Sequence, residues 1–77
     1  MSVEKWVISR APNHHGAYGR SKVYWTGSIA TAAGSTIIPN ITRERHLAGW
    51  WPSRLDALSA LTYDDRLARQ GFRVEAA

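Results

Sequence analysis

The first part of the chain contains two segments in which apolar and polar residues alternate, the pattern of half-buried β-strands. The first segment covers residues 3–10 and places Trp6 and Ile8 on one face of the expected strand. Residues 11–19, which follow it, are rich in Pro, Asn and Gly, and these residues favour turns. We therefore expect the two strands to form a hairpin with a long loop.

The second segment covers residues 20–28. Val23 and Trp25 share one face of this expected strand, whereas Lys22 and Tyr24 share the other. The alternation predicts that the first pair lies in the core and that the second pair lies on the surface.

The middle of the chain gives weaker signals. Residues 29–34 are small and show no periodicity. Residues 35–38 are compatible with a short strand, which Pro39 would keep away from the centre of a sheet. Residues 43–50 fit neither period, so a third strand and a short helix both remain open for them.

A helix signal opens the C-terminal third of the chain. Ser53 and Asp56 have the spacing of a capping box, and Pro52 fixes the entry to the helix. Apolar side chains then recur at helical spacing. They are Leu55, Leu58 and Leu61.

A single continuous helix would place Asp65 inside this apolar stripe, so we expect a break near Thr62, where a second capping box begins. A second helix should then run to Arg69, with Gly71 as its left-handed cap. Residues 72–74 alternate and fit a short edge strand.

These elements predict an α+β fold in a single domain, residues 1–77: an antiparallel sheet of about three strands packed against one or two C-terminal helices. Large aromatic side chains would supply much of the core of so short a chain. The expected core residues are Trp6, Ile8, Val23, Trp25, Leu55, Leu58, Leu61 and Leu67.

Charge is distributed unevenly along the sequence. The 77 residues include ten Lys or Arg and six Asp or Glu, a formal net charge of +4. Residues 1–45 carry six basic and two acidic side chains, whereas residues 46–77 carry four of each. No acidic residue lies between Glu4 and Glu44. A stretch of one sign attracts phosphates or an acidic protein surface.

Two features indicate a binding surface. Basic side chains and tyrosines surround the expected hairpin, an arrangement that can grip a phosphate backbone or stack on a base. Trp50 and Trp51 are neighbours, so that one can lie in the core while the other is an exposed hot spot. Alternatively, Pro52 folds the second ring over the helix start. The candidate partner-binding residues are Arg10, His14, His15, Tyr18, Arg20, Lys22, Tyr24, Arg43 and Trp51.

The sequence contains no motif for catalysis or metal binding. It has no cysteine, and His14 and His15 would point to opposite sides of an extended loop. It has no GxSxG motif either, and a chain this short can hardly enclose a pocket. We expect no enzymatic activity, no metal and no cofactor. We also expect no membrane segment, because no run of 18 apolar residues occurs and the N-terminus is polar.

The order of a WVI strand, a YW strand and a WPSxxDAL helix start is similar to that of many small phage-encoded proteins. Some proteins of this size and build are anti-CRISPR inhibitors, which bind a CRISPR effector complex and block its access to DNA. The resemblance covers residues 4–61 and lies in build rather than in a functional motif. Many anti-CRISPR proteins are acidic DNA mimics, whereas this chain is basic. A basic inhibitor would dock instead on an acidic protein surface, or on the guide or target backbone.

The resemblance implies a non-enzymatic phage inhibitor that blocks a binding surface of a bacterial defence complex in the host cytoplasm, as a monomer or homodimer. The alternative is a small basic protein that binds the backbone of DNA or RNA through its hairpin.

Overall fold

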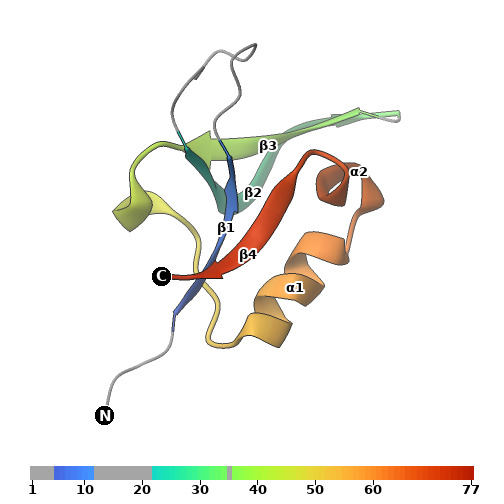
Figure 1. Ribbon diagram of the computed structural model, residues 1–77. Coiled ribbons are helices and arrows are strands. Elements are labelled where there is room, and N and C mark those ends of the chain that lie inside the picture. Colours follow the sequence, from blue (N-terminus) through green and yellow to red (C-terminus); the bar gives the residue numbers. More distant parts are fainter. Residues whose placement is uncertain (1–4, 12–21, 35) are drawn as a thin grey trace.

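The computed structural model describes residues 5–11, 22–34 and 36–77, and these residues form an α+β architecture (Figure 1). Four strands in these ranges make one antiparallel sheet with the order β3-β2-β1-β4. The predicted α+β class is confirmed, and so is the edge strand expected at residues 72–74, which pairs with the N-terminal strand; the sheet has four strands in the described residues rather than about three. The strands are β1 (Trp6–Arg10), β2 (Val23–Ala33), β3 (Thr36–Thr42) and β4 (Phe72–Ala76). The 3-10 turn η1 (Arg45–Leu47) and the helices α1 (Arg54–Thr62) and α2 (Asp65–Ala68) lie between β3 and β4.

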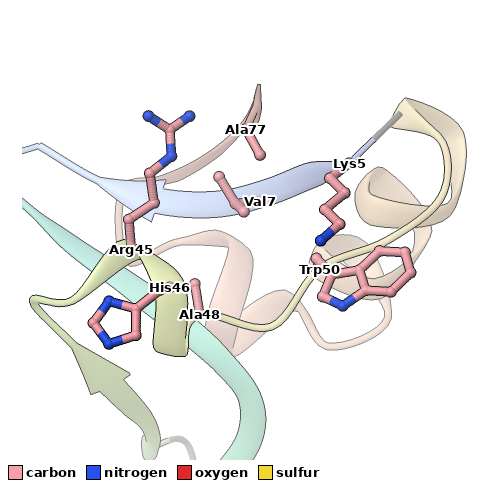
Figure 2. Close-up of a pocket in the computed structure, with 7 residues that line it drawn as sticks. All are labelled: Lys5, Val7, Arg45, His46, Ala48, Trp50 and Ala77. Carbon is pink, nitrogen blue, oxygen red and sulfur yellow. The ribbon is translucent and has the colours of Figure 1, made fainter. Parts of the chain in front are cut away.

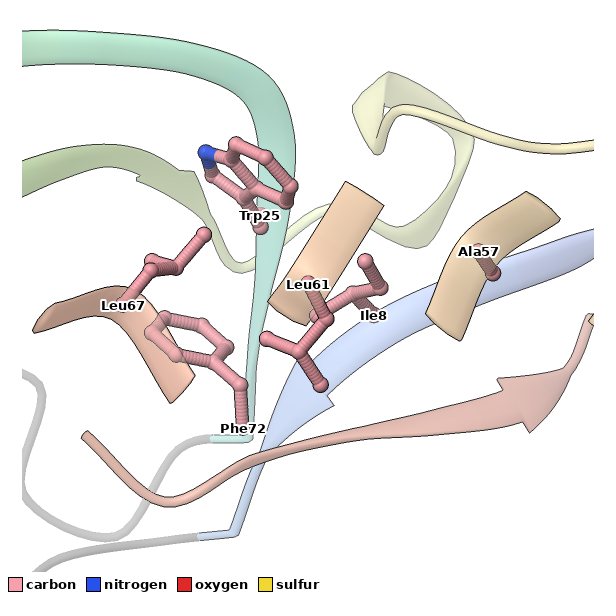
Figure 3. Close-up of a cluster of buried hydrophobic side chains, with 6 residues drawn as sticks. All are labelled: Ile8, Trp25, Ala57, Leu61, Leu67 and Phe72. Carbon is pink, nitrogen blue, oxygen red and sulfur yellow. The ribbon is translucent and has the colours of Figure 1, made fainter. Parts of the chain in front are cut away.

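One face of the sheet packs against the two helices and forms the main core (Figure 3). Ile8, in the central strand β1, is fully buried there. Burial of large apolar side chains is the dominant favourable contribution to folding, and aromatic residues contribute most per residue. The cluster consists of Ile8, Trp25, Ala57, Leu61, Leu67 and Phe72, with Trp6, Ile41, Trp51, Ala60 and Val74 packed around it. Most of the expected core is thus confirmed, including Val23, which is 2% exposed.

The prediction that Leu55 and Leu58 of α1 lie in the core is wrong. Leu55 is 71% exposed and Leu58 is 37% exposed, whereas Ala57 (0%) and Leu61 (5%) face the sheet. Ala57 and Leu61 are four residues apart and therefore share a helix face. Because alanine is small, a helix that turns this residue inward can approach the sheet closely. The leucine spacing predicted the helix but not its rotation.

Side chains cap both helices. The Ser53 hydroxyl accepts a hydrogen bond of 3.1 Å from the Asp56 amide, as the sequence predicted. The helix ends at Thr62, where a break was expected. The second helix is capped by Asp64 rather than by Thr62, because the Asp64 carboxylate accepts from the Arg66 amide at 2.9 Å.

The opposite face of the sheet is covered as well, which corrects the expectation that Tyr24 stands on the surface. Tyr24 is 8% exposed, Val7 3% and Ser9 0%. The Lys22 ammonium lies 5.7 Å from the centre of the Tyr24 ring. Residues 43–50 contain η1 and an extended stretch, and they border Val7 from this side.

β2 and β3 continue past the core as a two-stranded arm (Figure 1). Residues 27–34 are exposed, and the pairing register shifts near Gly27, whose φ of 99° suits glycine. Side chains near α2 brace the arm. The Arg66 guanidinium donates to the Gly34 carbonyl (2.7 Å), and the Gln70 amide donates to the Ile37 carbonyl (2.8 Å).

Candidate functional site

Four of the nine sequence-predicted site residues fall outside the described residues. They are His14, His15, Tyr18 and Arg20, in the segment 12–21. The structure describes the other five residues. Some of their side chains support the fold, and others are accessible to a partner.

The two described cations of the expected hairpin stem contact the protein itself. The Arg10 guanidinium lies 5.1 Å from the centre of the Phe72 ring. The Lys22 ammonium lies 2.6 Å from a carboxylate oxygen of Glu75, and the two side chains are 36% and 24% exposed. Arg43 is exposed. A partner that used Arg10 or Lys22 would therefore compete with contacts that the fold already makes.

The adjacent tryptophans have opposite environments. Trp51 exchanges two backbone hydrogen bonds of 2.9 Å with Trp6, and its ring stacks on Trp25 at a centroid distance of 5.7 Å. Trp50 is 52% exposed. One ring thus belongs to the core and the other to the surface, because neighbouring residues of an extended segment point to opposite sides. The exposed ring is Trp50, which replaces Trp51 in the candidate surface.

An open groove lies next to Trp50 on the face of the sheet opposite the helices (Figure 2). Its volume is about 420 Å³. Val7 from β1 contributes apolar surface, while Lys5 and Trp50 lie at one end and Arg45 at the other (Figure 2). The complete lining consists of Lys5, Val7, Arg45, His46, Ala48, Trp50 and Ala77.

Backbone contacts fix the segment that carries Trp50. The Gly49 amide donates to the Trp25 carbonyl at 3.1 Å. A Cβ atom at Gly49 would lie 2.6 Å from the Thr26 carbonyl oxygen, so only glycine allows this close approach to β2. Gly49 therefore sets the position of the exposed indole.

The cations of the groove are held at defined places. The Lys5 ammonium lies 5.2 Å from the centre of the Trp50 ring, within the range of a cation–π contact. The Arg45 guanidinium donates to the Ala76 carbonyl at 2.9 Å. Nδ1 of His46 lies 3.8 Å from the Glu44 carboxylate. The groove thus combines an indole surface with cationic side chains.

Glu75 is the β4 register partner of Val7, which lines the groove, and it forms an ion pair with Lys22. Burial alone would raise the pKa of Glu75, but the ion pair with Lys22, the Ser9 hydroxyl and the charge of Arg45 outweigh burial. The pKa of Glu75 therefore lies below its ordinary value, and the carboxylate stays ionised at neutral pH. It forms an ion pair with Lys22 and also interacts with the charge of Arg45.

The described residues contain no group of three or more His, Cys, Asp or Glu side chains that could hold a metal ion. In the same residues, no helix is both long and apolar enough to cross a membrane. The groove brings together cations, one aromatic ring and apolar surface, which suits the binding of an anionic partner with an apolar or flat group.

Comparisons with protein families, with curated proteins and with solved structures found no match to this chain.

Sequence reasoning missed Lys5, Arg45 and His46. The two arginines and the histidine within residues 43–46 were a visible basic cluster, but this segment fits neither a helical nor a strand period. Lys5 is 45 residues from Trp50 in sequence and reaches it only because the Trp51 backbone pairs with Trp6. No local pattern indicates that pairing.

Proposed function

We propose that this chain is a non-enzymatic binding protein that docks on an acidic surface of a protein partner through the groove around Trp50. The observation that carries the proposal is the half-exposed Trp50 ring, which contacts the Lys5 ammonium and lines a groove on one face of the sheet. Exposed tryptophans with neighbouring cations are typical of interface hot spots.

The groove is large enough for side chains of a protein partner. A volume of about 420 Å³ lies in the lower part of the range of about 300–1,000 Å³ known for ligand pockets. Such a groove accepts one or two side chains. Sites for single-stranded nucleic acid present aromatic platforms to successive bases, whereas Trp50 is the exposed ring in the lining of this groove.

The particular form that we propose is a phage inhibitor of a bacterial defence complex, of the anti-CRISPR kind, acting in the host cytoplasm. Its support is the similarity in size and element order to small phage-encoded proteins and the cationic groove, which fits an acidic effector surface. By occupying that surface, the protein would block access of the nucleic acid target.

A second candidate function is nucleic-acid binding. The specific observation in its favour is the combination of an indole with Lys5 and Arg45, because aromatic rings stack on bases while cations contact phosphates. Two further described cations, Arg10 and Lys22, already contact Phe72 of the main core and Glu75, respectively.

The test is a binding measurement against a panel of purified CRISPR effector complexes and, separately, against single-stranded and duplex DNA and RNA. We expect one effector to bind, and Trp50→Ala or Arg45→Glu to weaken binding by at least about 30-fold, the effect of a hot-spot residue. Arg69→Glu is the matched control, because Arg69 lies after α2 and its side chain is 78% exposed.

Three outcomes would count against the proposal. Binding of nucleic acid without any effector would favour the second candidate function. The logarithm of its binding constant should then fall linearly with the logarithm of the salt concentration, with a slope of about −0.9 per contacted phosphate on duplex DNA. Binding of neither class of partner would reject the inhibitor. Equal effects of Arg45→Glu and Arg69→Glu would reject the groove as the contact surface.

A further inference from the structure

The C-terminal strand β4 is an edge of the sheet. In the strand order β3-β2-β1-β4 it pairs with β1 on one side, and no described strand lies on its other side (Figure 1). The outer edge of a strand presents a row of backbone amides and carbonyls to which another strand can bind.

The register with β1 identifies the residues of β4 whose backbone groups point outward. The Ala77 amide donates to the Lys5 carbonyl at 2.9 Å, and from there every second residue of β4 bonds to β1. Ala76 belongs to the other set, because its register partner Trp6 uses its own amide and carbonyl for Trp51. The outward residues of β4 are therefore Phe72, Val74 and Ala76.

The opposite edge of the sheet is protected, in contrast to β4. The edge strand β3 contains Pro39, which has no amide hydrogen, and the Ile37 carbonyl accepts from the Gln70 side chain at 2.8 Å. Such features prevent an edge strand from pairing with another chain. β4 contains no proline, and its residues Arg73 and Ala76 are exposed. A further strand can therefore pair with β4 rather than with β3.

We propose that β4 pairs with β4 of a second copy of this chain, antiparallel and with Val74 on the two-fold axis. A two-fold interface must be complementary to itself, because the same surface meets its own copy. In this register the Val74 amide of each copy donates to the Val74 carbonyl of the other. Phe72 lies opposite Ala76 of the second copy, so all the outward residues of β4 face an outward residue.

Charge selects this register and this occupant. Arg73 and Glu75 flank Val74, and their side chains point to the same face of the sheet. With Val74 on the axis, each Arg73 lies opposite Glu75 of the other copy, and such cross-strand pairs of opposite charge are stabilising. An axis at Arg73 or at Glu75 would place like charges opposite each other. A strand of a different protein would need an acidic and a basic residue in this order, which β4 of a second copy supplies.

Both side chains have capacity for this contact. Arg73 is exposed and forms no ion pair within the described part of the chain. Glu75 already binds Lys22 at 2.6 Å, but a carboxylate has about four acceptor sites. Glu75 can therefore accept from Lys22 of its own chain and from Arg73 of the second copy.

The dimer places both candidate grooves on one side. Residues that lie opposite each other in paired strands point to the same side, so each face of the sheet continues from one copy into the other. Val7, the register partner of Glu75, lines the groove. Both grooves therefore open on the face that carries Arg73 and Glu75. A partner with repeated subunits would bind both, which increases the apparent affinity without any new contact.

The contact is short. The five residues of β4 span about 17 Å, and a contact of this size belongs to the weak class of protein interfaces. We expect a reversible dimer with a dissociation constant on the order of 100 µM.

The test is sedimentation equilibrium of the full chain over a range of concentrations, at about 0.15 M salt to screen the net charge. The wild type should dimerise, and Arg73→Glu should weaken the dimer by at least about tenfold, because the new carboxylate faces Glu75 of the second copy. Arg69→Glu is the matched control, since it makes the same change of charge outside β4 at a side chain that is 78% exposed. Both variants reduce the net charge of +4 and with it the general repulsion, so a loss confined to Arg73→Glu reports the local pair.

A mixture of two variants tests the register. Glu75→Lys should also weaken the dimer, because the new ammonium faces Arg73 of the second copy. When the Arg73→Glu and Glu75→Lys chains are mixed, opposite charges meet on both sides of the axis, so the mixture should form a heterodimer at least about tenfold tighter than either homodimer.

Ala76→Pro tests the same edge without a change of charge. It removes an outward amide hydrogen, leaves the bonds between β4 and β1 in place and should weaken the dimer by at least about tenfold. Circular dichroism of each variant shows that the fold is retained. The proposal is overturned by a wild type that remains monomeric at millimolar concentration or by an equal loss with Arg69→Glu. It is also overturned by a dimer that tolerates Ala76→Pro, or by folded Arg73→Glu and Glu75→Lys chains that do not associate when mixed.

Discussion

Replacing each of the two adjacent tryptophans with alanine should separate stability from binding. Trp51 has one ring face on Trp25 and packs against the main core, whereas Trp50 is half exposed and contacts the Lys5 ammonium. The two substitutions remove the same atoms from neighbouring positions. A difference between them therefore reports on the environment of each ring.

The structure indicates the size of each effect. Truncation of a fully buried tryptophan costs about 3–5 kcal/mol, and an aromatic pair adds about 0.5–1.5 kcal/mol. Because Trp51 is partly buried, we expect Trp51→Ala to cost about 2–4 kcal/mol. A domain of this length has a total stability of about 4–12 kcal/mol. For Trp50→Ala we expect a loss of about 0.5–1 kcal/mol, the worth of an exposed cation–π contact.

Thermal unfolding followed by circular dichroism measures both changes. In a domain of this size, 1 kcal/mol shifts the Tm by about 4–8 °C, so Trp51→Ala should lower the Tm by about 8 °C or more and Trp50→Ala by only a few degrees. Trp50→Ala should keep the fold and lose partner binding. A larger loss of Tm for Trp50→Ala than for Trp51→Ala would refute the assignment of the two rings.

Three further predictions concern the stability of the fold. Gly49→Ala should cost about 1–3 kcal/mol in urea unfolding, because its Cβ would lie 2.6 Å from the Thr26 carbonyl oxygen; unchanged stability would exclude this close approach. Leu61→Ala should cost about 2–5 kcal/mol and Leu55→Ala less than about 0.5 kcal/mol, and the reverse order would mean that α1 is rotated. Since the pKa of Glu75 is lowered from its ordinary 4.5 by folding, its contribution to stability is complete above pH 4.5 and is lost as the pH falls through the lower, folded-state value. A series of Tm measurements from pH 7 to pH 3 should show this loss, and Glu75→Gln should remove part of it; an unchanged pH profile in that variant would contradict the ion pair with Lys22.

Alternation, capping and helical spacing predicted the elements whose residues carry a strong local signal. Trp6 and Ile8 in β1, Ser53 at the start of α1 and the end of α1 at Thr62 follow the sequence pattern. The length of β2 was not predictable in this way, because its last residues are small and exposed, and no side-chain periodicity marks them.

Two errors have a common physical cause, namely that a pattern specifies an element but not what packs on each of its faces. Tyr24 alternates correctly with Trp25, yet both are buried because the sheet is covered on both sides. The leucines of α1 have helical spacing, yet the small Ala57 faces the sheet. The groove depends on the pairing of Trp6 with Trp51. These residues are far apart in sequence, and local periodicity does not predict a contact between them.

Photo-crosslinking from position 50 distinguishes docking of the groove on a protein from binding of nucleic acid. Trp50 is replaced by p-benzoylphenylalanine in bacteria that contain a CRISPR effector complex, and the same group is placed at Arg69 as the matched control on the helical side. We expect a cross-link from position 50 to an acidic surface of an effector subunit, and no cross-link to the effector from position 69. A cross-link to nucleic acid alone from position 50, or the same protein cross-link from both positions, would contradict this expectation.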